Sequence, residues 1–223
     1  MKKRVLVVSQ VLPFPGELNP TIKGRRSPHR INGSGNGGVP GPYPNMDTED
    51  KSYWVQKGRE EEDIFCKEIA PLYDLTIMIN PNKQDNPYDH DLMVLKDNKY
   101  HPAELKSVKT PFFKASEIAG IPPDKCVTFN HKDYIRYMSK YFYRKLYVFF
   151  WVEWEESKRK NIKVNKVSGL WGASIHYLDD LITSRKSGFH KYTRRASLQD
   201  GNAKASHMIS LDDLHQFTKH QIN

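Results

Sequence analysis

The chain has 223 residues, 38% of them hydrophobic and 27% charged, which is typical of a globular domain that buries roughly 70% of its unfolded surface. Its 35 lysines and arginines exceed its 26 acids, and the formal net charge of +9 suggests a polyanionic partner, most simply nucleic acid. Two cysteines exclude a disulfide framework and no apolar run approaches the ~20 residues that span a bilayer, so we expect a cytoplasmic, reducing setting without a membrane.

The N-terminal part combines a short apolar run with a long segment rich in glycine and proline. Residues 4–12, RVLVVSQVL, predict a buried strand. Residues 13–51 lack a periodic pattern and include Arg25, Arg26 and Arg30. A structureless run of this length is uncommon inside a compact domain, so the segment is either a disordered linker or a functional loop that orders on a partner. The arginines favour an arm that contacts phosphates.

Residues 52–73, SYWVQKGREEEDIFCKEIAPLY, predict a helix. Apolar residues such as Phe65 recur at helical spacing, and Pro71 ends the pattern. The apolar face includes or borders an acidic residue, either Glu61 or Glu62. Because acids near a helix N-terminus also interact favourably with the helix dipole, this cluster has a purely structural explanation as well.

Three strands are predicted next, at residues 74–80, 91–95 and 100–109. The KDNK sequence between the last two is typical of a hairpin turn. Alternate residues of a strand share a face. Glu104 and Lys106 therefore point the same way, and Leu105 points into the core.

The rest of the chain alternates helices, strands and basic loops. Residues 110–130 are predicted to be irregular, and the strongly apolar residues 145–154 to form a central strand. The other predicted elements are helices at 131–142, 176–185 and 210–221, a short strand at 166–175, and basic loops at 156–166 and 186–206. In the last helix, Ser210 and Asp213 are arranged much like a capping box.

One group of polar residues has the composition of a hydrolytic site. Asp91 opens a strand, and Glu104 and Lys106 lie one hairpin away, so antiparallel pairing can bring them together. Two carboxylates near a backbone carbonyl suit Mg²⁺, and a lysine beside them can orient or activate an attacking water. Asp89 competes with Asp91 as a ligand, whereas Lys109 lies on the opposite face by parity. An ordinary charged strand face is the alternative.

The spacing of these residues resembles a known signature. Asp91, followed thirteen residues later by Glu104-Leu105-Lys106, resembles the motif of the PD-(D/E)XK nuclease family. The preceding GREEE segment is similar to the glutamate-bearing helix of many members, with Glu62 as the counterpart. The resemblance implies that Asp91 and Glu104 bind Mg²⁺, that Lys106 positions the nucleophile, and that Glu62 is an accessory catalytic carboxylate.

The resemblance covers roughly residues 54–154. It implies an α/β fold with a central mixed sheet flanked by helices, built on the αβββαβ core of restriction endonucleases. One departure is His90, which stands where the family often has proline.

A chain of this organisation resembles an orthodox type II restriction endonuclease, which implies a homodimer that cuts double-stranded DNA in the presence of Mg²⁺. The expected division is one nuclease domain, 1–223, with a strand and arm at 1–51, the catalytic core at 52–154, and a basic, DNA-contacting or dimerising part at 155–223. The alternatives are a structure-specific repair, recombination or phage nuclease of the same fold, and a non-catalytic basic nucleic-acid-binding protein.

Basic and polar residues outside the motif are candidates for DNA contact, although a solvated surface explains them too. These candidates are Arg25, Arg26, Arg30, Lys114, Asn130, Arg136, Lys191, Arg194 and Arg195.

Overall fold

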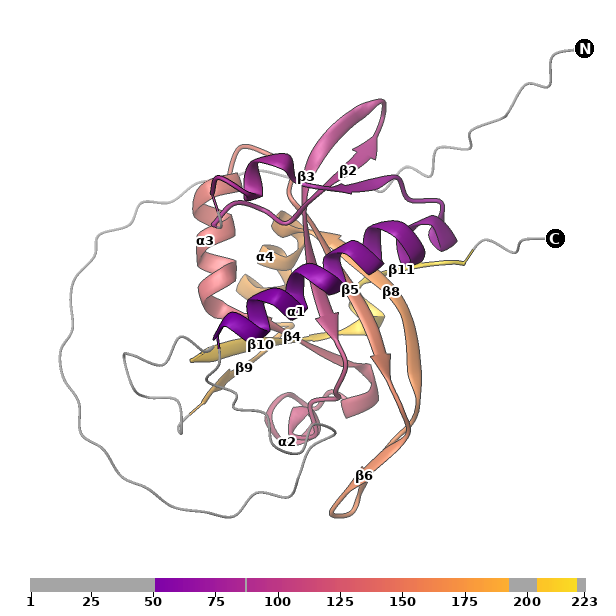
Figure 1. Ribbon diagram of the computed structural model, residues 1–223. Coiled ribbons are helices and arrows are strands. Elements are labelled where there is room, and N and C mark those ends of the chain that lie inside the picture. The colour runs from indigo at the N-terminus through magenta and orange to yellow at the C-terminus, as the bar shows by residue number, and fades with distance from the viewer. Residues whose placement is uncertain (1–50, 87, 193–203, 220–223) are drawn as a thin grey trace, which may run out of the picture.

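The computed structural model describes residues 51–86, 88–192 and 204–219 (Figure 1). The strand predicted at 4–12 and the arm predicted at 13–51, except for its last residue, lie outside the described residues. Some of the candidate DNA contacts lie outside them too, namely Arg25, Arg26, Arg30, Arg194 and Arg195.

Six strands form the central sheet, in the order β1-β2-β3-β5-β8-β11. These strands are β1 (Ile77–Ile79), β2 (Leu92–Lys96), β3 (Lys99–Val108), β5 (Tyr147–Trp154), β8 (Val167–Ser174) and β11 (His215–Phe217). β3 and β5 run parallel, and the other neighbours pair antiparallel. The sheet is therefore mixed, as predicted.

Two smaller sheets accompany it. The first has the order β4-β10-β9, with β4 (Cys126–Asn130), β10 (Ala205–Ser210) and β9 (Gly188–Lys191). The second is a hairpin of β6 (Ser157–Arg159) and β7 (Ile162–Val164).

The α-helices are α1 (Lys51–Ile64), α2 (Ala115–Ala119), α3 (His131–Tyr141) and α4 (Ile175–Thr183). α1 continues into a π-helical turn, Phe65–Ile69, and a 3₁₀ turn, Ala70–Tyr73. Further 3₁₀ turns are formed by Pro81–Lys83, Pro123–Lys125 and Leu211–Asp213.

The central sheet lies between two layers (Figure 1). α1 crosses one face, and α3, α4 and the β4-β10-β9 sheet cover the other. The alternation of side chains along β5 supplies both cores: Val148 and Phe150 pack with α3 and α4, whereas Phe149 and Trp151 pack with Phe65. Since both faces of β5 are buried, its sequence is a continuous apolar run.

The turn between β2 and β3 fixes which residues face each other. Asp97 and Asn98 both have positive φ angles, 51° and 60°, as the two-residue type I′ hairpin requires. This turn pairs Lys96 with Lys99 and continues to the pairing of Leu92 with Ala103. The predicted hairpin is confirmed.

Two stretches predicted to lack regular structure contain strands. The interval 110–130 holds α2 and β4, and the basic loop at 186–206 includes β9 and the start of β10. These short strands pair with one another, and Val127 and Phe129 of β4 are fully buried under α3. Tertiary pairing, which no local pattern predicts, therefore decides their conformation. The predicted basic loop at 156–166 is likewise mostly the β6–β7 hairpin.

The helix predicted at 210–221 is wrong. The Ser210 side chain does accept a hydrogen bond from the Asp212 amide, but the turn that it begins ends at Asp213. Leu211 and Leu214 are buried in the core, and β11 then pairs with β8 at the edge of the central sheet. Burial of the two leucines and the backbone pairing outweigh the local capping signal.

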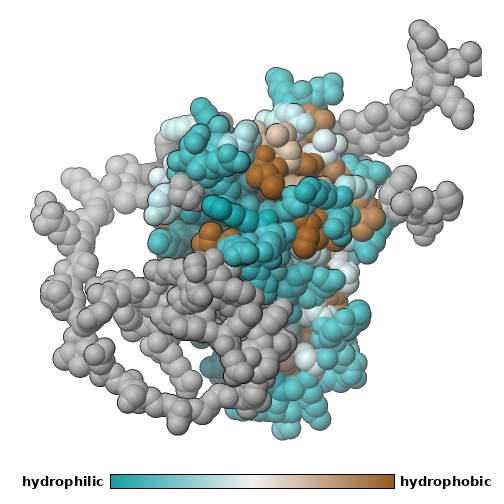
Figure 2. All heavy atoms as spheres, viewed as in Figure 1, coloured by the Kyte–Doolittle hydropathy of each residue, from teal (hydrophilic) through white to brown (hydrophobic). Residues whose placement is uncertain are grey.

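The visible surface is mainly hydrophilic, with separate hydrophobic patches (Figure 2). Across the described ranges, no helix is long and apolar enough to cross a membrane.

Candidate active site

Glu104 and Lys106 lie on the face of β3 that is turned toward α3. Their partners in the parallel ladder with β5 are Val148 and Phe150, which belong to the core beneath α3. Leu105 points to the opposite face and is buried with the residues that pack under the end of α1. The predicted alternation along this strand is thus observed.

Glu104 is the most enclosed carboxylate of the group, with 3% of its surface exposed. Its Oε1 accepts hydrogen bonds from Lys106 Nζ at 2.9 Å and from the Tyr137 hydroxyl. Burial raises the pKa of Glu104 to about 6, against the opposing charge of Lys106 and with help from the charge of Asp91. The carboxylate therefore titrates close to neutral pH.

Lys106 bridges β3 and α3. Its Nζ lies 2.9 Å from Glu104 Oε1 and 2.9 Å from Asp133 Oδ2. Burial alone lowers the pKa of a lysine, but the charges of Glu104 and Asp133 outweigh it and hold the pKa of Lys106 well above its usual value. Lys106 is accordingly an ammonium group in this arrangement, a donor of hydrogen bonds and not a base.

Asp91 lies beside Glu104, because the hairpin register that pairs Leu92 with Ala103 continues by one residue. The Asp91 amide is 3.4 Å from Glu104 Oε2. The competing ligand Asp89 lies elsewhere: it pairs with Lys140 at 2.6 Å and accepts a hydrogen bond from the Tyr141 hydroxyl. The structure brings Asp91, and not Asp89, to Glu104.

Glu62 reaches the same region from α1. It is buried, and its Oε1 lies 2.6 Å from Lys83 Nζ, which also forms an ion pair with Asp91. Burial raises the pKa of Glu62, and the hydrogen bond from Lys83 opposes the shift. Phe65, one helical turn later, packs against Phe149 and Trp151 and so fixes the end of α1 on the sheet.

Three residues of the site were not among the predicted ones, namely Lys83, Asp133 and Tyr137. Asp133 and Tyr137 are four residues apart on α3, so both face β3. That spacing is the one local signal that could have indicated them. Lys83 follows β1 and belongs to no motif, and the 3₁₀ turn at Pro81–Lys83 brings it to Asp91.

The predicted DNA contacts within the described residues have different positions. Arg136 adjoins the site: its Nη2 lies 2.6 Å from the Tyr137 hydroxyl and 3.2 Å from Asp133 Oδ1. Asn130 caps α3 by accepting a hydrogen bond from the Lys132 amide. Lys114 precedes α2, and Lys191 ends β9; both are exposed. In the described part of the chain, no hydrogen bond or ion pair joins Asn130, Lys114 or Lys191 to the carboxylates of the site.

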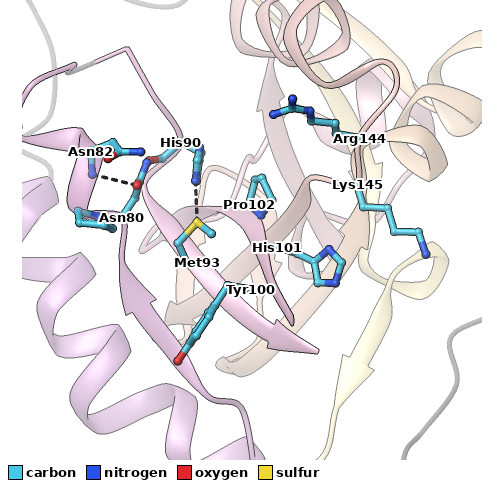
Figure 3. Close-up of a pocket in the computed structure, with 10 residues that line it drawn as sticks. Asn80, Asn82, His90, Met93, Tyr100, His101, Pro102, Arg144 and Lys145 are labelled. Atoms are coloured by element: carbon cyan, nitrogen blue, oxygen red, sulfur yellow. Dashed lines mark hydrogen bonds between the residues drawn. The ribbon is translucent and has the colours of Figure 1, made fainter. Parts of the chain in front are cut away.

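An open pocket of about 540 Å³ is lined in part by residues that adjoin Asp91 and Glu104 in the sequence (Figure 3). His90, which precedes Asp91, lies on one side, and Arg144 and Lys145, which follow α3, lie on the other. Pro102 in its wall lies two residues before Glu104 and on the same face of β3. The cationic residues on this wall suit a phosphate group next to the site.

The donor set fits a hard divalent cation, since carboxylate oxygens are the ligands that Mg²⁺ prefers. Glu62 and Asp91 already share one cation, the ammonium group of Lys83. As they stand, however, no three acidic, histidine or cysteine side chains in the described part of the chain are close enough together to hold a metal ion. The chemistry of the ligands fits Mg²⁺, while Lys83 lies between Glu62 and Asp91, and Lys106 is paired with Glu104.

The raised pKa of Glu104 predicts a pH dependence of stability. Between the ordinary value of 4.5 and about 6, the unfolded chain ionises at this residue before the folded protein does. The free energy of unfolding should therefore fall by about 2 kcal/mol as the pH rises through this window. Urea unfolding of metal-free protein at pH 4.5 and 6.5 captures most of this change. The Glu104→Gln variant should lack this component, and an identical pH response in both proteins would contradict the assignment.

No protein-family model and no curated protein matches this sequence. Among solved structures, a nuclease from a fusselovirus is similar, with a TM-score of 0.37 and 11% sequence identity over 78% of this chain and 90% of that chain. A likeness at this level supports no functional conclusion. Any conclusion about function therefore depends on the residues of the site.

Proposed function

We propose that this protein is a Mg²⁺-dependent DNA endonuclease that hydrolyses phosphodiester bonds with Glu62, Asp91, Glu104 and Lys106. The observation that carries the proposal is the contact of a buried glutamate on β3 with both Lys106 and the main chain of Asp91. Glu104 and Lys106 follow Asp91 by thirteen and fifteen residues. Glu62 of α1 joins this group through its ion pair with Lys83, which also binds Asp91. A charged strand face in water has no reason to bury such a group.

Each side chain has a role that its surroundings support. Asp91 and Glu104 would hold Mg²⁺, with Glu62 as an accessory carboxylate. When bound, Mg²⁺ lowers the pKa of a bound water and neutralises charge on the phosphoryl oxygens. Lys106, kept as an ammonium group by Glu104 and Asp133, would donate hydrogen bonds that orient the attacking water or a phosphate oxygen.

The charge distribution favours a nucleic acid as the partner, and we propose double-stranded DNA as the substrate. The formal net charge is +9, although the site itself gathers carboxylates. Arg136 lies beside the site, and 35% of its side chain is exposed. This guanidinium group and the cationic wall of the pocket are suited to phosphate oxygens on either side of a cut.

The proposal extends to a type II restriction endonuclease that acts as a homodimer. A symmetric pair of sites would cut both strands of a palindromic sequence. The basic residues around β9, including Lys191, would supply contacts outside the reaction centre. Light scattering on the purified protein, with and without duplex DNA, measures the oligomeric state.

Digestion of plasmid DNA tests the proposed activity. Full-length protein with Mg²⁺ is expected to convert supercoiled plasmid to discrete linear fragments, and to leave it intact with EDTA or with Ca²⁺. Fragments with defined ends indicate sequence-specific cleavage, whereas cleavage confined to junctions or flaps indicates the structure-specific alternative. DNA binding that weakens with salt, but is never followed by cleavage of any duplex or branched substrate, would replace the nuclease proposal by the non-catalytic one.

A further inference from the structure

Lys83 occupies the space between two of the proposed metal ligands. Its Nζ lies 2.6 Å from Glu62 Oε1 and forms an ion pair with Asp91 Oδ1. The three side chains are largely buried, with exposed fractions of 12% for Glu62, 17% for Asp91 and 19% for Lys83. A single ammonium group thus joins a carboxylate of α1 to one at the start of β2.

The main chain around Lys83 is built to deliver this ammonium group. Asn80 is 1% exposed, and its side chain accepts a hydrogen bond from the Asn82 amide at 3.1 Å, which starts the 3₁₀ turn (Figure 3). The Asn80 side chain also donates to the His90 carbonyl oxygen at 2.9 Å, and the Asn80 amide donates to the Asp91 carbonyl oxygen at 2.9 Å. The turn that carries Lys83 is therefore tied to the residues that carry Asp91.

Without a cation between them, the largely buried carboxylates of Glu62 and Asp91 would repel each other, because little water is present to screen their charges. Lys83 removes that repulsion and keeps Glu62 and Asp91 near Glu104. The same contact has a cost for metal binding, because an ammonium group and Mg²⁺ both require the carboxylate oxygens. In the described ranges no three ligands stand close enough for a metal ion while Lys83 is in place.

From this geometry we infer that Lys83 is a built-in placeholder cation, which holds Glu62 and Asp91 in the metal-free protein and is displaced when a divalent cation binds. The inference rests on the proposed metal-dependent function. It predicts that metal binding is a competition within the site, so that the measured affinity equals the intrinsic affinity multiplied by the fraction of molecules in which Lys83 has left the carboxylates.

Titration calorimetry with Ca²⁺, on full-length protein and without DNA, tests the inference. Lys83→Met keeps the aliphatic stem and removes the ammonium group. We expect it to bind Ca²⁺ about tenfold or more tightly than the wild type, since removing a competitor restores the intrinsic affinity. Lys140→Met is the matched control, because it removes a lysine from Asp89, two residues from Asp91, without touching Glu62 or Asp91. It should bind Ca²⁺ as the wild type does.

A second measurement needs no variant. Acetylation of lysines, followed by mass spectrometry, should label Lys83 slowly in metal-free wild type and several-fold faster with saturating Ca²⁺, because the displaced amine loses its carboxylate partners. The labelling of Lys67, an exposed lysine paired with Asp63, should be unchanged.

The outcomes separate this inference from the proposed function. Equal Ca²⁺ affinities in the wild type and Lys83→Met, or labelling of Lys83 that ignores Ca²⁺, would overturn the placeholder role and leave the nuclease proposal standing. Equal gains in Lys83→Met and Lys140→Met would also overturn it, since net charge alone would then explain the change. If no protein binds Ca²⁺, Mg²⁺ or Mn²⁺, the proposed metal dependence fails together with the inference.

Discussion

Replacement of Lys106 by methionine is expected to lower the rate of DNA cleavage by about 10²–10³-fold, the usual effect of removing one well-placed electrostatic donor. The ammonium group of Lys106 lies between Glu104 and Asp133 and is the group best placed to orient a water or a phosphate oxygen. Methionine keeps the aliphatic stem, so the packing of β3 against α3 should change little. Single-turnover cleavage at saturating enzyme measures the chemical step apart from DNA binding.

Lys109→Met is the matched control for this change. Lys109 lies on the same segment, but its Nζ is paired with Glu153 at 2.7 Å and lies 3.4 Å from the centre of the Trp151 ring, on the other face of the sheet. Its replacement should leave the cleavage rate within about twofold of the wild type, as surface changes away from a site do. A loss of rate that is equal in the two variants would argue against a specific role for Lys106.

Asp91→Asn is expected to weaken divalent-cation binding by at least about 10–100-fold, and to lower cleavage in proportion at limiting Mg²⁺. Asparagine has nearly the same shape as aspartate but lacks the negative charge that a hard cation needs. Lys83 would also lose one of its two carboxylates. Calorimetry with Ca²⁺ measures the affinity, and the dependence of the cleavage rate on Mg²⁺ concentration shows whether excess metal restores activity.

Asp89→Asn tests whether the position or merely the local charge matters. Asp89 is two residues from Asp91, yet it contacts Lys140, His90 and Tyr141 and not Glu104. Its replacement should reduce stability through the lost ion pair while metal affinity stays close to the wild-type value. If Asp89→Asn, and not Asp91→Asn, abolished metal binding, the ligand assignment would have to move to Asp89.

The central part of the candidate site follows from local rules, and could therefore be predicted from sequence. A two-residue turn at Asp97 and Asn98 fixes the β2–β3 register, so Asp91 must lie beside Glu104. The alternation of a strand then places Glu104 and Lys106 on one face. By contrast, the choice of Glu62 over Glu61 was open, because it depends on how α1 docks through Phe65.

The errors at the C-terminal end show why other features could not be predicted. Ser210 and Asp213 have the spacing of a helix start. Leu214 is nevertheless buried, and β11 pairs with β8, a strand far away in sequence. The interval 110–130 similarly becomes ordered by pairing β4 with β10. In both places the gain from long-range pairing and burial exceeds the small energies of local propensity.

Periodicity and one tight turn are enough to indicate the mixed α/β organisation around a central apolar strand and the placement of Asp91 beside Glu104 and Lys106. The contact of Asp133 on α3 with Lys106, and the position of Lys83 between Glu62 and Asp91, depend instead on how the elements pack. Those contacts join segments 21 and 27 residues apart across elements whose docking is set by the whole core. No spacing rule covers them, because the geometry between docked elements is a property of packing and not of the chain.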